Sequence, residues 1–148
     1  MYRSYKEFNG YSTAFRQWRA DSHCRYVHGY AIHFKVWFEG ELDERNWVCD
    51  FGCFKRNGIK DMLKEMFDHT TIVADDDPYL DRFIEMANSD LIQLRTMSDV
   101  GCEKFAEWVF NAVNEAIQLE TDGRVNVYKV QCWEHSENMA EYYGKQAN

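Results

Sequence analysis

The stretch from Tyr30 to Phe38 alternates in hydrophobicity, and this alternation constrains the fold more than any other feature of the sequence. Successive side chains of a strand point to opposite faces, so residues two apart share a face. The pattern therefore predicts a strand that ends at Gly40 and has two partly covered faces. One face carries Tyr30, Ile32, Phe34, Val36 and Phe38, and the other carries Ala31, His33, Lys35 and Trp37.

The rest of the chain divides into strand-like and helix-like stretches. The aromatic-rich stretch from residue 2 to about 18 is the predicted hairpin partner of this strand. Alternation returns over 124–134, and residues 138–143 are expected to form a last short strand. Apolar residues at helical spacing predict helices over 53–67 and 102–119. Residues 70–97 form a long connection, in which Asp75-Asp76-Asp77-Pro78 is interpreted as the solvated start of a short helix.

This order of elements predicts an α+β fold, with a four-stranded antiparallel sheet and two long helices packed on one face. Such a sheet has open edges, and pairing of the edges between copies into an oligomeric barrel is one way to cover them. The chain contains one proline and no Gly/Ser-rich linker. Residues 1–148 are therefore expected to form a single domain.

The charge and the cysteine content narrow the classes of function. Seventeen basic and twenty-five acidic side chains give a net charge of −8, which disfavours unspecific binding of nucleic acid. No apolar run approaches the length that crosses a bilayer, so no membrane association is expected. Five cysteines, an odd number without zinc-knuckle spacing, favour a reduced, cytoplasmic compartment.

Thiol, imidazole and carboxylate groups gather in three short strings. Cys24 and His28 flank a turn that leads into the first long strand, and His23 adds a third candidate ligand or base. Asp68 and His69 follow a predicted helix, where a carboxylate can orient an imidazole for proton transfer. Each pair also has a purely structural interpretation. Cys24 and His28 would be a buried thiol and a hydrogen-bonded histidine, and His69 would be a histidine favoured by the dipole at a helix end.

Glu134 stands at the predicted end of the strand over 124–134. A carboxylate presents two parallel acceptors, which suits a planar amide or guanidine-like group. The alternative is a charged residue beside a turn. His33 lies on the opposite strand face from His28 by parity, and we interpret it as structural or surface-facing. Together these strings indicate a small-molecule enzyme site.

Taken in order, the strings resemble the 6-pyruvoyl-tetrahydropterin synthase/6-carboxytetrahydropterin synthase family of the tunnelling fold, over nearly the whole chain. They stand where that family has its aromatic-x-Ala-Ala-His, Cys-x3-His-Gly-His, Asp-Phe, Leu-Asp-His, Pro-Thr-x-Glu and Val-x-Val-x-Glu strings. The strings here are Tyr11-Ser12-Thr13-Ala14-Phe15, Cys24-x3-His28-Gly29-Tyr30, Trp47-Val48-Cys49-Asp50-Phe51, Phe67-Asp68-His69, Val100-Gly101-Cys102-Glu103 and Val130-Gln131-Cys132-Trp133-Glu134.

The resemblance implies an activity and a role for each residue. In such enzymes three histidines bind zinc. The zinc coordinates the side-chain hydroxyls of 7,8-dihydroneopterin triphosphate and makes the adjacent C–H more acidic. By resemblance Cys24 is the general base, Asp68 and His69 form a proton relay, and Glu134 anchors the N–H edge of the pterin. The product would be a pyruvoyl- or carboxy-tetrahydropterin, the latter an early intermediate of 7-deazaguanine (queuosine) synthesis. The resemblance also implies homotrimers or homohexamers whose sheets join into a barrel.

Two of the three zinc positions of the family are Phe15 and Tyr30 in this chain, and only His28 remains. Phenylalanine cannot ligate a metal and neutral tyrosine is a poor zinc ligand. The threonine of the Pro-Thr string is Gly101.

Three explanations stay open. The zinc site is rebuilt from His28 and His23; or the enzyme works without metal and holds an anionic or hydroxylated substrate; or the protein only binds a pterin or purine-like ring, as a non-catalytic binding or assembly protein. For the second explanation the candidate substrate-binding residues are Arg16, Gln17 and Arg19.

Overall fold

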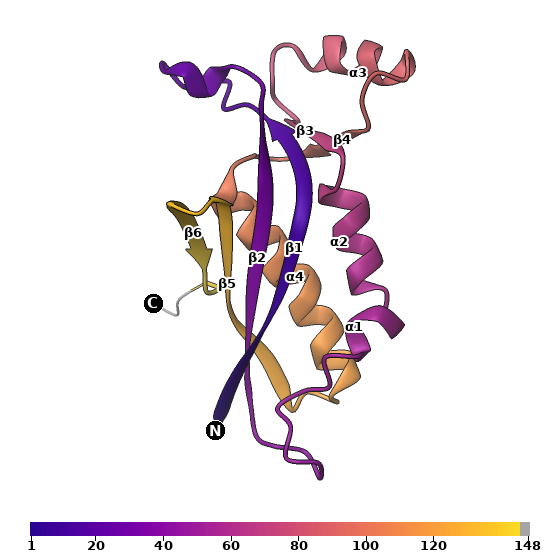
Figure 1. The fold of residues 1–148 in the computed structure, drawn as a ribbon, viewed down its shortest axis with the longest axis vertical. Coiled ribbons are helices and arrows are strands. Elements are labelled where there is room, and N and C mark those ends of the chain that lie inside the picture. Colours follow the sequence, from indigo (N-terminus) through magenta and orange to yellow (C-terminus); the bar gives the residue numbers. More distant parts are fainter. Residues whose placement is uncertain (146–148) are drawn as a thin grey trace.

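A six-stranded mixed sheet forms the centre of the computed structural model, which describes residues 1–145 (Figure 1). Three of its strand pairs, β1·β2, β2·β5 and β5·β6, are antiparallel, whereas β1·β3 and β3·β4 are parallel. The spatial order is β4-β3-β1-β2-β5-β6. The strands are β1 (Tyr2–Phe15), β2 (His28–Gly40), β3 (Thr70–Ala74), β4 (Leu94–Met97), β5 (Val125–His135) and β6 (Asn138–Tyr142).

The α+β class is confirmed, but the prediction of a sheet with four antiparallel strands is wrong. The four expected strands are present, and β3 and β4 extend the sheet beyond β1. All five residues of β3 are buried, so this strand shows no alternation from which it could have been predicted. β4 is only four residues long. Both strands lie within the stretch that was expected to be a connection.

The predicted helix over 53–67 is two helices, α1 (Cys53–Arg56) and α2 (Ile59–Phe67). Gly58 separates them with a φ of +83°, a left-handed conformation that glycine adopts without a steric penalty. The chain therefore has one long helix, α4 (Cys102–Glu120), where two were expected. A further helix, α3 (Leu80–Asn88), lies beside the β3 and β4 end of the sheet, and a short 3₁₀ helix, η1 (His23–Arg25), precedes β2 (Figure 1).

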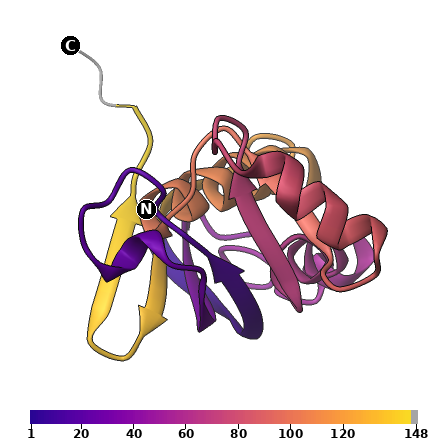
Figure 2. The ribbon, with the colours of Figure 1, turned by 90° about the horizontal axis from the view of Figure 1, so that it is seen from above.

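The hydrophobic core lies between one face of the sheet and the helices α1, α2 and α4 (Figures 1 and 2). The ring centroids of Phe34 and Phe67 are 4.9 Å apart, and those of Phe15 and Phe105 are 5.1 Å apart. Burial of each such side chain contributes about 1.5–3 kcal/mol. The alternation predicted over residues 30–38 is confirmed in β2. Four of the five residues on its inward face are fully buried: Ile32, Phe34, Val36 and Phe38.

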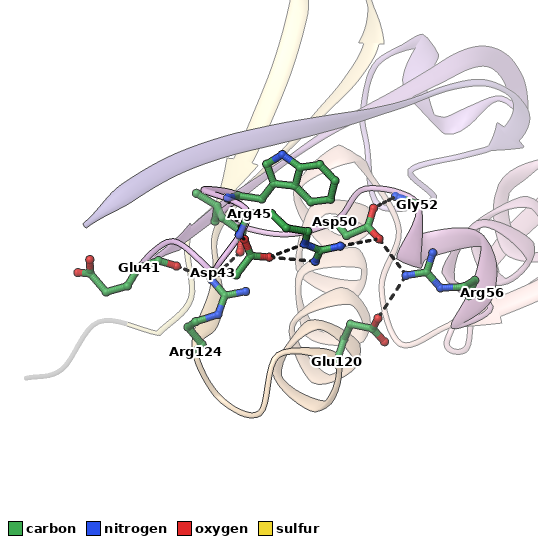
Figure 3. Close-up of polar contacts among 10 residues, drawn as sticks. Glu41, Asp43, Arg45, Asp50, Gly52, Arg56, Glu120 and Arg124 are labelled. Carbon is green, nitrogen blue, oxygen red and sulfur yellow. Dashed lines mark hydrogen bonds and ion pairs between the residues drawn. The ribbon is translucent and has the colours of Figure 1, made fainter.

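The loop over residues 41–52, at the far end of β2 from the site described below, is held by a polar network (Figure 3). Arg124 donates to the carbonyl oxygens of Glu41 and Val48, the latter at 2.8 Å. The Asp50 carboxylate pairs with Arg56 at 3.1 Å, and Arg56 also lies 3.6 Å from Glu120 at the end of α4. These charges fix the loop to the helices. None of the helices within residues 1–145 has the length and apolar character needed to cross a membrane.

Candidate active site

A pocket of about 170 Å³ lies where the end of β1, the start of β2, the β5–β6 hairpin and the N-terminus of α4 meet. It is smaller than the roughly 300–1,000 Å³ typical of small-molecule sites. Other hollows on the chain are larger, but this pocket gathers groups from several of the strings picked out in the sequence. The string residues that line it are Phe15, Cys24, His28, Tyr30, Gly101, Cys102, Glu103 and Glu134, and the candidate substrate-binding residue Gln17 lines it too.

Three rings form the floor of this pocket, and the β1·β2 register brings them together. Phe15 pairs with His28 across the two strands, and Tyr30 shares the face of His28 because it is two residues further on. The ring centroids lie 5.8 Å apart for Phe15 and His28, 5.5 Å for Phe15 and Tyr30, and 4.8 Å for His28 and Tyr30. Phe15 is 3% exposed and stands edge-on against Phe105 of α4.

The hydrogen-bonding character of His28 and Tyr30 follows from their surroundings. Nδ1 of His28 lies 2.6 Å from the carbonyl oxygen of Tyr26. Because a carbonyl only accepts, Nδ1 carries a proton, and in this tautomer Nε2 is the acceptor. Burial raises the pKa of Tyr30, and the nearby Glu134 carboxylate raises it further, so its hydroxyl stays protonated.

These residues do not fit the zinc ion that the resemblance implied. Phe15 has no donor atom, and a tyrosine with a raised pKa remains a neutral, poor ligand. His23, the other candidate ligand, is exposed on η1 and does not line the pocket. Within the part of the chain that the structure describes, no three His, Cys, Asp or Glu side chains converge as a metal set. A zinc centre with His28 and His23 stays a prediction without support from this geometry.

Glu134 reaches the pocket from the end of β5 and is held by Asn138 of β6. The Nδ2 of Asn138 donates to Oε1 of Glu134 at 3.0 Å and lies 3.1 Å from Nε2 of His135. This contact orients the carboxylate toward the pocket. Asn138 was not among the predicted site residues. Its position four residues after Glu134, across a predicted hairpin, was the available signal.

Cys24 is partly buried, and its loop is tied to the end of β1. The N–H of Gln17 donates to the carbonyl oxygen of Cys24 at 2.9 Å. The Gln17 side chain donates to the carbonyl of Val100 at 2.9 Å, just before α4. A Cβ on Gly101 would collide with Nε2 of Gln17, and Gly101 has a φ of +118°. The Gln17 amide ends a flexible side chain and can move, so the positive φ is what explains the glycine where the family string has threonine.

Arg16 and Arg19 do not line the pocket, although they were candidate substrate-binding residues. Arg16 donates twice to Asp77, at 2.8 and 2.6 Å, and Arg19 pairs with Asp76 at 2.5 Å. Asp77 is 5% exposed, so the interpretation of this acidic run as a solvated helix start is wrong for Asp77. Its burial opposes ionisation, but hydrogen bonds from Arg16 and from the Tyr79 N–H lower its pKa overall. The two pairs connect the end of β1 to the segment before α3.

Asp68 and His69 lie together, but outside the Cys24 pocket. Oδ1 of Asp68 is 3.0 Å from Nδ1 of His69 and accepts the backbone N–H of Ser12 at 3.1 Å. That backbone hydrogen bond is the main cause of the lowered pKa of Asp68, and His69 adds to it. The pair lines a separate, open hollow with residues such as Lys64 and Arg95. One chain therefore brings together Cys24, His28 and Glu134, and leaves the Asp-His pair apart.

Comparison with known proteins bears on the family to which the chain belongs. A family model described as 6-pyruvoyl tetrahydropterin synthase matches residues 4–145. A protein of Pyrococcus abyssi named "Putative 6-carboxy-5,6,7,8-tetrahydropterin synthase" is 27% identical over 146 residues, which cover 92% of this chain and 85% of that protein. A protein of the same name from Pyrococcus horikoshii is 28% identical over 145 residues, with the same coverage.

Solved structures share the fold. An uncharacterized protein of Wolinella succinogenes superposes with a TM-score of 0.83 at 22% identity, covering 97% of this chain and 98% of that one. The 6-pyruvoyl tetrahydropterin synthase of Caenorhabditis elegans gives a TM-score of 0.63 at 19% identity, covering 98% of both chains. At these identities the likeness concerns the fold alone. With the family match over residues 4–145, however, the chain belongs to the 6-pyruvoyl tetrahydropterin synthase family.

Proposed function

We propose that this protein is a pterin-handling lyase of the 6-pyruvoyl- or 6-carboxy-tetrahydropterin synthase type. It would convert 7,8-dihydroneopterin triphosphate by proton transfer on the side chain and elimination of triphosphate. One observation carries the proposal: the Cys24 thiol and the Glu134 carboxylate, from opposite ends of the chain, line one pocket. A base and an anchor for a flat heterocycle are the two groups that such chemistry needs.

In this proposal Glu134 holds the ring and Cys24 acts on the side chain. The carboxylate of Glu134 accepts two N–H bonds from the amide and amine edge of a pterin, with Asn138 fixing its orientation. The thiolate of Cys24 removes the side-chain proton.

A second copy of the chain would complete the site. The pocket of one chain, about 170 Å³, is small for a pterin with a triphosphate side chain. Asp68 and His69 lie outside it, so as a proton relay they would come from a neighbouring protomer. Strands β4 and β6 are edges of the sheet, and β1 pairs with β3 only over residues 13–15. These free edges support a homotrimer or homohexamer built by edge pairing.

The reaction can be tested directly with 7,8-dihydroneopterin triphosphate. We expect release of triphosphate by the wild-type protein, loss of turnover in Cys24→Ala with binding retained, and loss of binding in Glu134→Gln. Glu137→Gln is the matched control, because Glu137 is exposed on the same hairpin and does not line the pocket. A substrate left unchanged both with and without added zinc would refute the enzymatic proposal.

A second candidate is a non-catalytic pterin- or purine-binding protein on the same fold. The observation that favours it is the replacement of two metal-ligand positions by Phe15 and Tyr30. This alternative predicts tight binding that depends on Glu134, no turnover, and no effect of Cys24→Ala.

A further inference from the structure

We propose that Tyr30 and His28 form a metal-independent binding site for a hydroxyl group of the substrate, at the place where the family resemblance implies a metal. The inference rests on the proposed function, because it assumes that the pocket takes a pterin. It goes further in naming the group that the altered centre recognises: an alcohol on the side chain of the ring.

Tyr30 supplies the donor of this pair. Its side chain is half-buried and lines the pocket, and within residues 1–145 its hydroxyl has no hydrogen-bond partner. A phenol hydroxyl is both a donor and an acceptor, so the O–H of Tyr30 is available to donate into the pocket. The hydroxyl is open to solvent in the pocket, since among the described residues only Ser4 Oγ is a buried oxygen without a partner, so a substrate hydroxyl would replace water at this position.

His28 supplies the acceptor. Its Nδ1–H is committed to the carbonyl oxygen of Tyr26 at 2.6 Å, and in this tautomer Nε2 is the acceptor. The His28 and Tyr30 ring centroids are 4.8 Å apart with an interplanar angle of 77°. A substrate hydroxyl can accept from Tyr30 and donate to His28 at once, which neither an apolar group nor a carbonyl can do.

Phe15 forms the apolar side of this site. Its ring is 3% exposed and stands against Phe105, so it cannot ligate or donate and offers no site to water. A hydrogen bond beside such a wall is stronger than one in open solvent. The competing interpretation is that Phe15 and Tyr30 simply fill the volume of the absent imidazoles, in which case the phenol oxygen contributes nothing to binding.

Two ligands that differ only in the side chain separate these interpretations. We would measure the affinities of 7,8-dihydroneopterin and of 6-methyl-7,8-dihydropterin, which lacks hydroxyls, for the wild-type protein and for Tyr30→Phe. We expect Tyr30→Phe to weaken binding of dihydroneopterin about 3- to 10-fold, the usual loss for one hydrogen bond, and to leave the methyl ligand unchanged. Tyr5→Phe is the control, because Tyr5 lies outside the pocket, beside Trp37.

The outcomes are distinct. Equal affinity for the two ligands, or a Tyr30→Phe variant that binds both as the wild-type protein does, would overturn this inference and leave the proposed function standing. Failure of the wild-type protein to bind either pterin would overturn both. Elemental analysis adds a separate readout: stoichiometric zinc in the wild-type protein that is lost in His28→Gln would contradict a metal-independent centre.

Discussion

The ion pair between Arg16 and Asp77 allows the sharpest test of how this fold is held together. The pair joins the end of β1 to the segment before α3, and its side chains are 15% and 1% exposed. The neighbouring pair, Arg19 and Asp76, is 64% and 47% exposed. Asp77 and Asp76 therefore each form an ion pair with an arginine, one pair buried and the other exposed. Asp77→Asn and Asp76→Asn form a matched pair of variants.

The expected losses of stability differ several-fold. Removing one partner of a buried pair costs about 3–5 kcal/mol, because the other charge stays buried without compensation. We expect about 3 kcal/mol for Asp77→Asn, since Arg16 keeps some exposure and asparagine retains an acceptor. An exposed pair contributes about 0–1 kcal/mol, which is the expectation for Asp76→Asn. For a chain of this size, Asp77→Asn should lower the Tm by about 6–12 °C. Asp76→Asn should lower it by less than about 4 °C.

The loss also depends on pH. The pKa of Asp77 is lowered in the folded protein, so its contribution is fully present above the unfolded value near 3.9 and is lost as the pH falls toward the folded value. Thermal unfolding followed by circular dichroism at pH 7 and near pH 3.5 measures this directly. The gap between the wild-type protein and Asp77→Asn should narrow at the lower pH. Variants with equal Tm values at pH 7 would refute the reasoning.

Two further predictions concern the pocket. Gly101→Ala should destabilise the protein by about 1–3 kcal/mol in chemical denaturation, because its φ of +118° is strained for any residue with a Cβ. At Gly29 φ is not positive and a Cβ would meet only an ordinary contact, so Gly29→Ala should be tolerated. Equal losses in the two variants would contradict this. The double variant Phe15→His/Tyr30→His should gain close to one zinc per chain and a zinc-dependent rise in Tm that the wild-type protein lacks, measured by elemental analysis and thermal unfolding. A wild-type protein that responds to zinc equally would show that these positions do not control metal binding.

Much of the fold was predictable because its signals are local. A strand with one buried face repeats every second residue, and this period located β2 and β5 within one or two residues of their ends. The helical period located α4 in the same way. β3 gave no signal because both of its faces are buried, so every residue is apolar or packed. Gly58 was visible in the sequence, but the break it makes between α1 and α2 depends on its left-handed φ.

The sequence by itself identified candidate residues for chemistry and determined, through strand parity, that His28 and Tyr30 share a face. Only the tertiary structure decided their partners. It placed Cys24 and Glu134 in one pocket, paired Arg16 with the buried Asp77, and left Asp68 outside that pocket. The physical reason is that periodicity records the face on which a side chain lies. Pairing between strands and loops distant in the chain is set by packing and charge that no local pattern encodes.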